Sequence, residues 1–125
     1  MSKVQVKKGE IYYVDLEGTR GSEIKKVRYC LICQNNVGNR YSNTTIIIPI
    51  THRPNKNQPT QLQLQDYMFE ESTQKIDGMI LAEQIRTVDK SRILSPRIGK
   101  LTLETMHLVD QAILISMGIS ARATA

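Results

Sequence analysis

The chain has 125 residues, of which 40% are hydrophobic and 23% are charged, the composition of a globular protein rather than of a disordered segment. Its longest purely apolar run, Ile46 to Ile50, is too short to cross a bilayer, and its N-terminus lacks the apolar core of a secretion signal. We therefore expect one domain over residues 1–125, soluble and cytoplasmic, with no membrane partner.

The positive charge is concentrated in one half of the chain. The net charge is +5, and residues 1–60 contain ten Lys and Arg against four Asp and Glu. A basic surface of this kind favours a polyanion such as nucleic acid, or an acidic protein, as the partner. An ordinary basic surface on a small soluble domain remains the alternative on charge alone.

The first two predicted strands enclose a polar loop. Residues 10–16 are rich in β-branched and aromatic side chains, which predicts a strand. Residues 17–25 contain two glycines and four charges, which is typical of a mobile hairpin loop. Residues 27–35 are apolar on both faces and predict a central strand, with Arg28 at its entrance. A cation at the base of a buried strand is well placed to meet a phosphate.

Cys30 and Cys33 form a CxxC pair within this second strand. Such a pair can bind a metal or act in redox chemistry. Residues i and i+3 of a strand point to opposite faces, however, so we interpret both as buried thiols.

The middle of the chain predicts further strands. Residues 44–51 are β-branched throughout, and Pro49 cannot donate to a ladder, which indicates an edge or a bulge near the strand's end. The remaining elements expected here are an Asn- and Gly-rich turn over residues 35–43, an exposed loop over 52–59, a strand over 60–65, a strand over 78–87 and a helical turn over 89–93.

The last element is an amphipathic helix. Thr102 is a suitable N-cap, Glu104 lies in the first turn, and Gly118 ends the helix. Strands followed by one long helix predict a mainly β protein, a small, partly closed antiparallel barrel with a C-terminal helix. The stripe that we expect to pack on the sheet, and against a second subunit, consists of Met106, Val109, Ile113 and Met117, widened by Leu108, Ala112 and Ile115.

Catalytic and metal-binding signatures are absent from the sequence. There is no GxSxG, HExxH, phosphate loop or spaced histidine cluster, and the carboxylates are scattered. We therefore expect an activity without metal or cofactor, built from Arg, Thr, His and Gln side chains.

Several short segments form a recognisable series, namely Lys8 to Leu16, Gly21-Ser22-Glu23, Val27-Arg28, Gln34-Asn35, Asn39-Arg40, Pro49-Ile50-Thr51 and Leu81 to Lys90. In order and spacing they resemble the MazF/PemK family of toxin endoribonucleases over about residues 7–119. The resemblance implies a homodimer of about five-stranded SH3-like barrels with a C-terminal helix, the fold of the PemK, CcdB and Kid toxins. It also implies the toxin of a type II toxin-antitoxin system, which cleaves single-stranded mRNA at selected sequences without a metal, inhibits growth and is held inactive by an acidic cognate antitoxin.

The resemblance also implies roles for individual residues. The catalytic arginine of the family falls on Arg28 and its catalytic threonine on Thr51, while the Gly-Ser-Glu loop corresponds to a flexible lid. His52 is either a general base or an exposed loop residue. The RNA-binding candidates are Gly21, Ser22, Glu23, Lys25, His52, Arg53, Gln84 and Arg86.

The chemistry implied is attack of a 2′-OH on the adjacent phosphorus, with Arg28 neutralising charge, to leave a 2′,3′-cyclic phosphate and a 5′-OH. The sequence departs from the family at Tyr29, where proline is usual, and at Asn36, where aspartate is usual. Tyr29 leaves open a member that only binds RNA or antitoxin. A gyrase inhibitor of the same fold is a further alternative, although Met117-Gly118-Ile119 replaces the Trp-Gly-Ile of such toxins.

Overall fold

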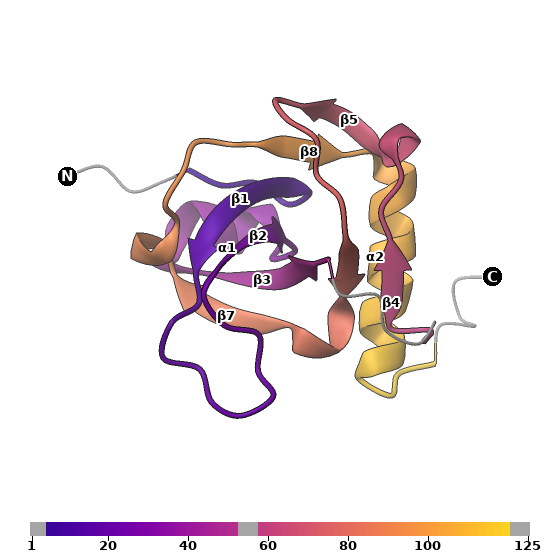
Figure 1. Ribbon diagram of the computed structural model, residues 1–125, viewed down its shortest axis with the longest axis horizontal. Helices are drawn as coiled ribbons and strands as arrows, with labels where there is room; N and C mark the ends of the chain where they lie inside the picture. The colour runs from indigo at the N-terminus through magenta and orange to yellow at the C-terminus, as the bar shows by residue number, and fades with distance from the viewer. Residues whose placement is uncertain (1–4, 53–57, 121–125) are drawn as a thin grey trace.

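The computed structural model describes residues 5–52 and 58–120, which form a curved antiparallel sheet with one long helix along its side (Figure 1). None of the helices in these residues is long and apolar enough to cross a membrane. The strands are β1 (Glu10–Asp15), β2 (Val27–Ile32), β3 (Thr44–Thr51), β4 (Gln61–Gln63), β5 (Phe69–Ser72), β6 (Met79–Leu81), β7 (Arg86–Asp89) and β8 (Gly99–Leu101). The helices are α1 (Asn36–Tyr41), α2 (Leu103–Ser116) and the 3-10 turns η1 (Asp66–Met68), η2 (Ala82–Gln84) and η3 (Lys90–Arg92).

Strand β3 is the centre of the sheet. The strand order is β4-β6-β3-β2-β1-β8-β5, with β7 also paired to β3. One edge of β3 pairs with β2, and the other edge pairs first with β7 and then with β6. The bounds predicted for this strand are confirmed. Of the edge or bulge predicted at Pro49, the edge is excluded, because β3 is paired on both sides. Pro49 is buried opposite Cys30 and lies between the last residue paired to β7, Ile47, and the first paired to β6, Ile50.

The sheet buries both of its faces, as the apolar second strand predicted. One face packs against α2 through residues such as Leu31, Ile48 and Val109. The opposite face closes on itself around Val14, Leu16 and other side chains. This curvature brings the start of β2 close to the end of β3, where the candidate site lies.

Helix α2 begins and ends where the sequence predicts. The Thr102 hydroxyl accepts a hydrogen bond from the backbone N–H of Thr105 at 3.1 Å. At the other end, Gly118 has a φ of 73° and donates to Ile115, while Ile119 donates to Leu114, which is a Schellman motif. The widened apolar stripe is only partly buried: Met106, Val109 and Ala112 are in the core, whereas Leu108, Ile115 and Met117 are about half exposed.

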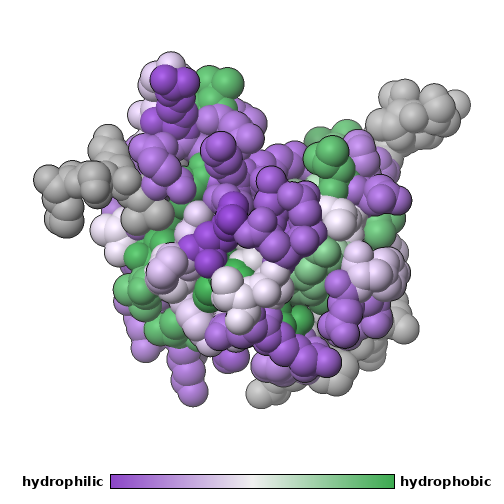
Figure 2. All heavy atoms as spheres, turned by 90° about the horizontal axis from the view of Figure 1, so that it is seen from above, coloured by the Kyte–Doolittle hydropathy of each residue, from purple (hydrophilic) through white to green (hydrophobic). Residues whose placement is uncertain are grey.

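The structure has eight strands among the described residues, so the expected five-stranded sheet was wrong. Strand β8 has three residues and begins with a glycine, and β5 carries two glutamates, so neither shows a strand pattern in sequence. The glutamates of β5 pair with Arg97 and, at 3.8 Å, with Lys100. Charged residues protect an edge strand from pairing with other chains. Figure 2, which shows the molecule from above the view of Figure 1, has a mainly hydrophilic face with scattered hydrophobic residues.

Two other predicted segments also differ. Residues 33–35 leave the second strand, and the predicted turn after them contains α1. The predicted strand over residues 78–87 is interrupted by η2. Ile50 pairs with Ile80 and Ile47 with Arg86, so β3 advances three residues while its partner advances six. Turn η2 contains the three extra residues.

Candidate active site

Arg28 and Thr51 come together through the β2–β3 register. Cys30 lies opposite Pro49 and Leu31 opposite Ile48. Continuing this register by two residues places Arg28 opposite Thr51, and opposed residues of neighbouring strands point to the same face. Both residues line one hollow of about 520 Å³. We call this the catalytic hollow.

The Arg28 side chain is held at the entrance to β2. Its Nε donates a hydrogen bond to the Lys25 carbonyl at 3.1 Å, and its terminal nitrogens make no hydrogen bond or ion pair within the part of the chain that the structure describes. A guanidinium held by one nitrogen keeps a fork of donors for two oxygens of a phosphate. Thr51 is buried at the end of β3 and pairs with Met79 of β6.

The catalytic hollow carries an excess of available positive charge. Lys25, Lys26 and Arg28 line it together with two glutamates. The Glu83 carboxylate accepts hydrogen bonds from Thr60 and Gln61, both at 2.9 Å, and the Glu23 carboxylate accepts one from the backbone N–H of Arg20. Three cations against two carboxylates leave a net positive charge, which favours an anionic ligand.

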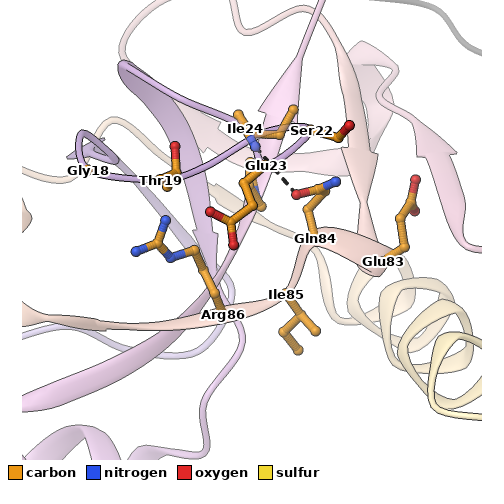
Figure 3. A pocket seen from close by; sticks show the side chains of 10 residues that line it. Gly18, Thr19, Ser22, Glu23, Ile24, Glu83, Gln84, Ile85 and Arg86 are labelled. Atoms are coloured by element: carbon orange, nitrogen blue, oxygen red, sulfur yellow. Dashed lines mark hydrogen bonds between the residues drawn. The ribbon is translucent and has the colours of Figure 1, made fainter.

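The loop between β1 and β2 covers this hollow and is attached at two points. At its root, Arg92 donates to the carbonyls of Asp15 and Glu17, each at 3.0 Å. At its tip, the backbone N–H of Ile24 donates to Gln84 Oε1 at 3.4 Å (Figure 3). The loop ends at Lys26, whose φ of 71° is unusual for a residue with a side chain. This turn directs the chain into β2 just before Arg28.

A second hollow of about 510 Å³ lies beside the first, and we call it the side hollow. The two share a wall formed by Ser22, Glu23 and Ile24 of the loop and by Glu83 and Gln84 of η2. The remaining lining residues of the side hollow are Gly18, Thr19, Pro49, Ile85 and Arg86.

Most of the predicted site residues meet at these two hollows. Gly21, Ser22, Glu23, Lys25 and Gln84 line the catalytic hollow with Arg28 and Thr51, and Arg86 lines the side hollow. His52 follows Thr51 and is exposed, and it lines neither hollow. Arg53 lies outside the described residues.

Sequence reasoning missed Gly78, which packs on the backbone of Thr51. Gly78 has a φ of +140°, and a Cβ at this position would lie 2.7 Å from the Thr51 carbonyl oxygen. Only glycine combines this conformation with so close an approach. The sequence signal was a glycine directly before the apolar run that forms β6.

Tyr29, which follows Arg28, is anchored on the opposite face of β2. Its ring stacks on Tyr13 with centroids 4.5 Å apart, and its hydroxyl accepts a hydrogen bond from Gln74 Nε2 at 2.7 Å. Interaction with the Tyr13 hydroxyl, and then burial, raise the pKa of Tyr29. The side chain is therefore a neutral anchor that turns away from the catalytic hollow.

The two cysteines are separate thiols on opposite faces of the sheet, as predicted, but only Cys30 is fully buried and Cys33 is partly buried. Cys30 packs in the core on one face of the sheet, and Cys33 packs on the other. Burial raises the pKa of Cys33 to about 12 and raises that of Cys30 as well. Residues 5–52 and 58–120 contain no group of three or more His, Cys, Asp or Glu side chains placed to hold a metal ion.

The segments Gln34-Asn35 and Asn39-Arg40 lie just before α1 and within it, at the far end of β3. Asn35 caps the helix by accepting from Gly38 N at 2.8 Å. Asn39 is 1% exposed and accepts hydrogen bonds from Gln34 Nε2 at 3.1 Å and Thr45 Oγ1 at 2.7 Å. Asn39 Nδ2 also donates to the Gln34 carbonyl at 2.9 Å. These residues form a structural clamp, not part of either hollow.

The fold and site together define a small β protein with a C-terminal helix and a cationic hollow of about 520 Å³ that pairs an arginine with a threonine. Residues 7–117 match the model of the PemK-like, MazF-like toxins of type II toxin-antitoxin systems, and the chain belongs to this family. The resemblance seen in the sequence is thereby confirmed.

Comparisons with individual proteins support the same family assignment. Endoribonuclease EndoA of Bacillus subtilis is 42% identical over 117 residues, which cover 91% of this chain and 96% of the relative. A MazF crystal structure from Deinococcus radiodurans matches with a TM-score of 0.78 at 16% identity, over 93% of this chain and 99% of that one. A mycobacterial endoribonuclease in complex with its cognate antitoxin matches with a TM-score of 0.74 at 21% identity, over 92% and 97%. The two structures support the fold.

Proposed function

We propose that this toxin is a metal-independent endoribonuclease that cuts single-stranded RNA, acting in the cytoplasm as one toxin domain over residues 1–125. The observation that carries the proposal is the position of Arg28 opposite Thr51 in a hollow with excess positive charge. The 42% identical relative, which is an endoribonuclease, supports the same activity.

The reaction uses a nucleophile that RNA itself supplies. The 2′-oxygen attacks phosphorus and loses its proton, the bond from phosphorus to the 5′-oxygen breaks, and that oxygen gains a proton. The products are a 2′,3′-cyclic phosphate and a 5′-OH. DNA lacks the 2′-OH and is not cut.

Arg28 stabilises the negative charge that develops on the phosphoryl oxygens. Its fork of donors matches two oxygens at once, and a guanidinium with a pKa above about 12 keeps its charge throughout. The Thr51 hydroxyl donates a hydrogen bond to the same phosphoryl group. The loop from Gly18 to Lys26 acts as a lid that positions RNA, with Lys25 and Gln84 as further contacts.

The active form is a homodimer inhibited by an antitoxin. Leu108, Ile115 and Met117 leave an apolar strip of α2 about half exposed, which suits a second copy of the chain. An acidic antitoxin segment complements the cationic hollow and competes with RNA. We infer from the family resemblance that each curved sheet corresponds to an SH3-like barrel.

The test is cleavage of a long single-stranded RNA by the purified chain in EDTA, with mapping of the new ends. We expect discrete cuts with 5′-OH ends, reduced about 10²- to 10³-fold by Arg28→Ala. Arg20→Ala is the matched control, because Arg20 belongs to the same loop and lines neither hollow.

Intact RNA with the wild-type chain would overturn the proposal. Inhibition of DNA supercoiling with intact RNA would instead identify a gyrase-directed toxin. Intact RNA that is bound in a salt-sensitive manner would identify a binding-only member of the family.

A further inference from the structure

We propose that a third hollow, formed by α1 and the segment before β1, binds single-stranded RNA at a distance from the cut. We call it the end hollow. Its volume is about 860 Å³, and it shares no lining residue with the catalytic hollow or the side hollow. The inference rests on the proposed endoribonuclease activity and gives the RNA substrate a second place of contact on this chain. The residues that line the end hollow include Val6, Lys7, Val37, Arg40 and Tyr41.

The end hollow is the most positive of the three hollows. Lys7 and Arg40 line it, and none of its lining residues in the described part of the chain is acidic. The catalytic hollow has three cations against two carboxylates, and the side hollow has one cation against two. The Glu10 carboxylate accepts a hydrogen bond from the backbone N–H of Lys7 at 2.8 Å, but it is buried and pairs with Arg97 at 3.0 Å. Two cations without a facing carboxylate attract a polyanion.

An exposed aromatic ring lies beside these cations. Tyr41 is 73% exposed, and the Arg40 guanidinium carbon lies 5.4 Å from the centroid of its ring. Val37, four residues earlier and therefore on the same side of α1, is 72% exposed. Proteins that bind single-stranded nucleic acid combine a positive groove with aromatic rings on which bases of any identity stack. An acidic peptide would neutralise the cations but would bring no base to the ring, so RNA fits the end hollow better.

The end hollow and the catalytic hollow lie at the two ends of one face of β2. Side chains alternate between the faces of a strand, so Arg28 and Ile32 point to the same face. Ile32 belongs to the same core cluster as Val6, and Val6 lines the end hollow. Arg28, at the other end of the strand, lines the catalytic hollow. One molecule of RNA can therefore meet both hollows on the same side of the sheet.

The distance between the two hollows sets the length of RNA that reaches both. Strand β3 begins at Thr44, shortly after Tyr41, and ends at Thr51. It spans about 23 Å at the usual rise of a strand. A stacked strand of nucleic acid advances about 3.4 Å per nucleotide, so about seven nucleotides bridge this distance. A shorter RNA occupies the catalytic hollow alone.

The experiment compares two RNAs that share one cut site, mapped beforehand with the wild type. The short RNA has about six nucleotides, and the long RNA has about 20 with the cut site at its centre. A 2′-deoxy nucleotide at the cut prevents cleavage, so that fluorescence anisotropy measures the Kd of each RNA. The unmodified RNAs give kcat under saturating conditions.

Tyr41→Ala should weaken binding of the long RNA about fivefold or more, because a stacked base is lost. Arg40→Gln and Lys7→Gln should each lower the slope of log Kd against log salt by about 0.7, the value for one phosphate contact to a single strand. The Kd of the short RNA and the kcat on both RNAs should stay at wild-type values. Tyr67→Ala and Lys75→Gln are the matched controls, because both side chains are exposed and line none of the three hollows.

An unchanged Kd of the long RNA in all three variants, each shown to be folded by circular dichroism, would overturn the RNA site while the endoribonuclease activity stands. An equal loss of affinity for the short and the long RNA would do the same, because the short RNA does not reach the end hollow. Weaker binding of polyglutamate with an unchanged Kd of the long RNA would identify a site for an acidic protein instead. RNA left intact by the wild type would remove the proposed function and this inference together.

Discussion

Asn39 holds α1 against β3, and its replacement by alanine should show how much of the stability depends on this clamp. The Asn39 side chain is 1% exposed and makes bonds of 2.7 to 3.1 Å with Gln34 and Thr45. Thr45 is itself fully buried. Asn39→Ala would leave the Thr45 hydroxyl and the Gln34 carbonyl without this partner, at about 1–3 kcal/mol for each buried group.

The summed loss should be about 2–6 kcal/mol in the free energy of unfolding, a large part of the roughly 5–15 kcal/mol of a small domain. Urea unfolding followed by far-UV circular dichroism measures it. The matched control is Asn43→Ala: the Asn43 side chain is exposed, and the carbonyl that accepts from Lys90 N is kept. The control should change stability by less than about 0.5 kcal/mol.

A loss below about 1 kcal/mol for Asn39→Ala, or an equal loss for Asn43→Ala, would refute the clamp. Cleavage supplies a second check. Thr44 and Thr51 lie at opposite ends of the eight-residue β3, about 23 Å apart at the usual rise of a strand. Folded Asn39→Ala protein at low temperature should therefore cut RNA at the wild-type rate.

Two further substitutions test other parts of the molecule. Gly78→Ala places a Cβ 2.7 Å from the Thr51 carbonyl oxygen, so cleavage by the folded protein should fall about tenfold or more. The control is Gly99→Ala, whose Cβ would lie 3.2 Å from the Glu71 carbonyl oxygen and which should lower stability alone. Equal cleavage rates for the two variants would contradict the role of Gly78. The pKa of Cys33 in the folded protein is about 12, above its ordinary value near 9. The stability that the neutral thiol contributes is therefore complete below pH 9 and is lost as the pH rises from about 9 to 12. The free energy of unfolding falls by up to about 1.4 kcal/mol per pH unit in this range. Urea unfolding of Cys33→Ala at pH 8 to 10.5 should show a shallower decline than the wild type, and parallel declines would show that another group titrates.

The parts of the fold that the sequence predicts are those with strong local signals. The β-branched run of β3 and the Thr102 and Gly118 caps of α2 define their elements almost to the residue. Helix α1 has no such signal, because Asn, Gly and Tyr are weak helix formers. This segment is helical because of the buried hydrogen bonds that the Asn39 side chain makes. Strands β5 and β8 form only because β1 offers β8 an edge and β8 offers one to β5.

The candidate site, too, could be predicted only in part from the sequence. Arg28 and Thr51 were paired through the family resemblance, and the β2–β3 register gives a geometric reason for that pairing. The side hollow could not be predicted, because Thr19 and Arg86 are brought together by the loop position and by the interruption of the predicted strand at η2. Both depend on contacts between residues distant in sequence.

The change of partner along β3 also bears on how this toxin can evolve. Arg28 lies on β2, which pairs with β1 and β3, whereas Thr51 lies at the end of β3 and also pairs with β6, which pairs in turn with β4. Substitutions on β4 or β6 that never touch RNA can therefore move the threonine relative to the arginine. The rate of the proposed reaction can therefore change through substitutions in β4 and β6 while the loop and β7 stay as they are.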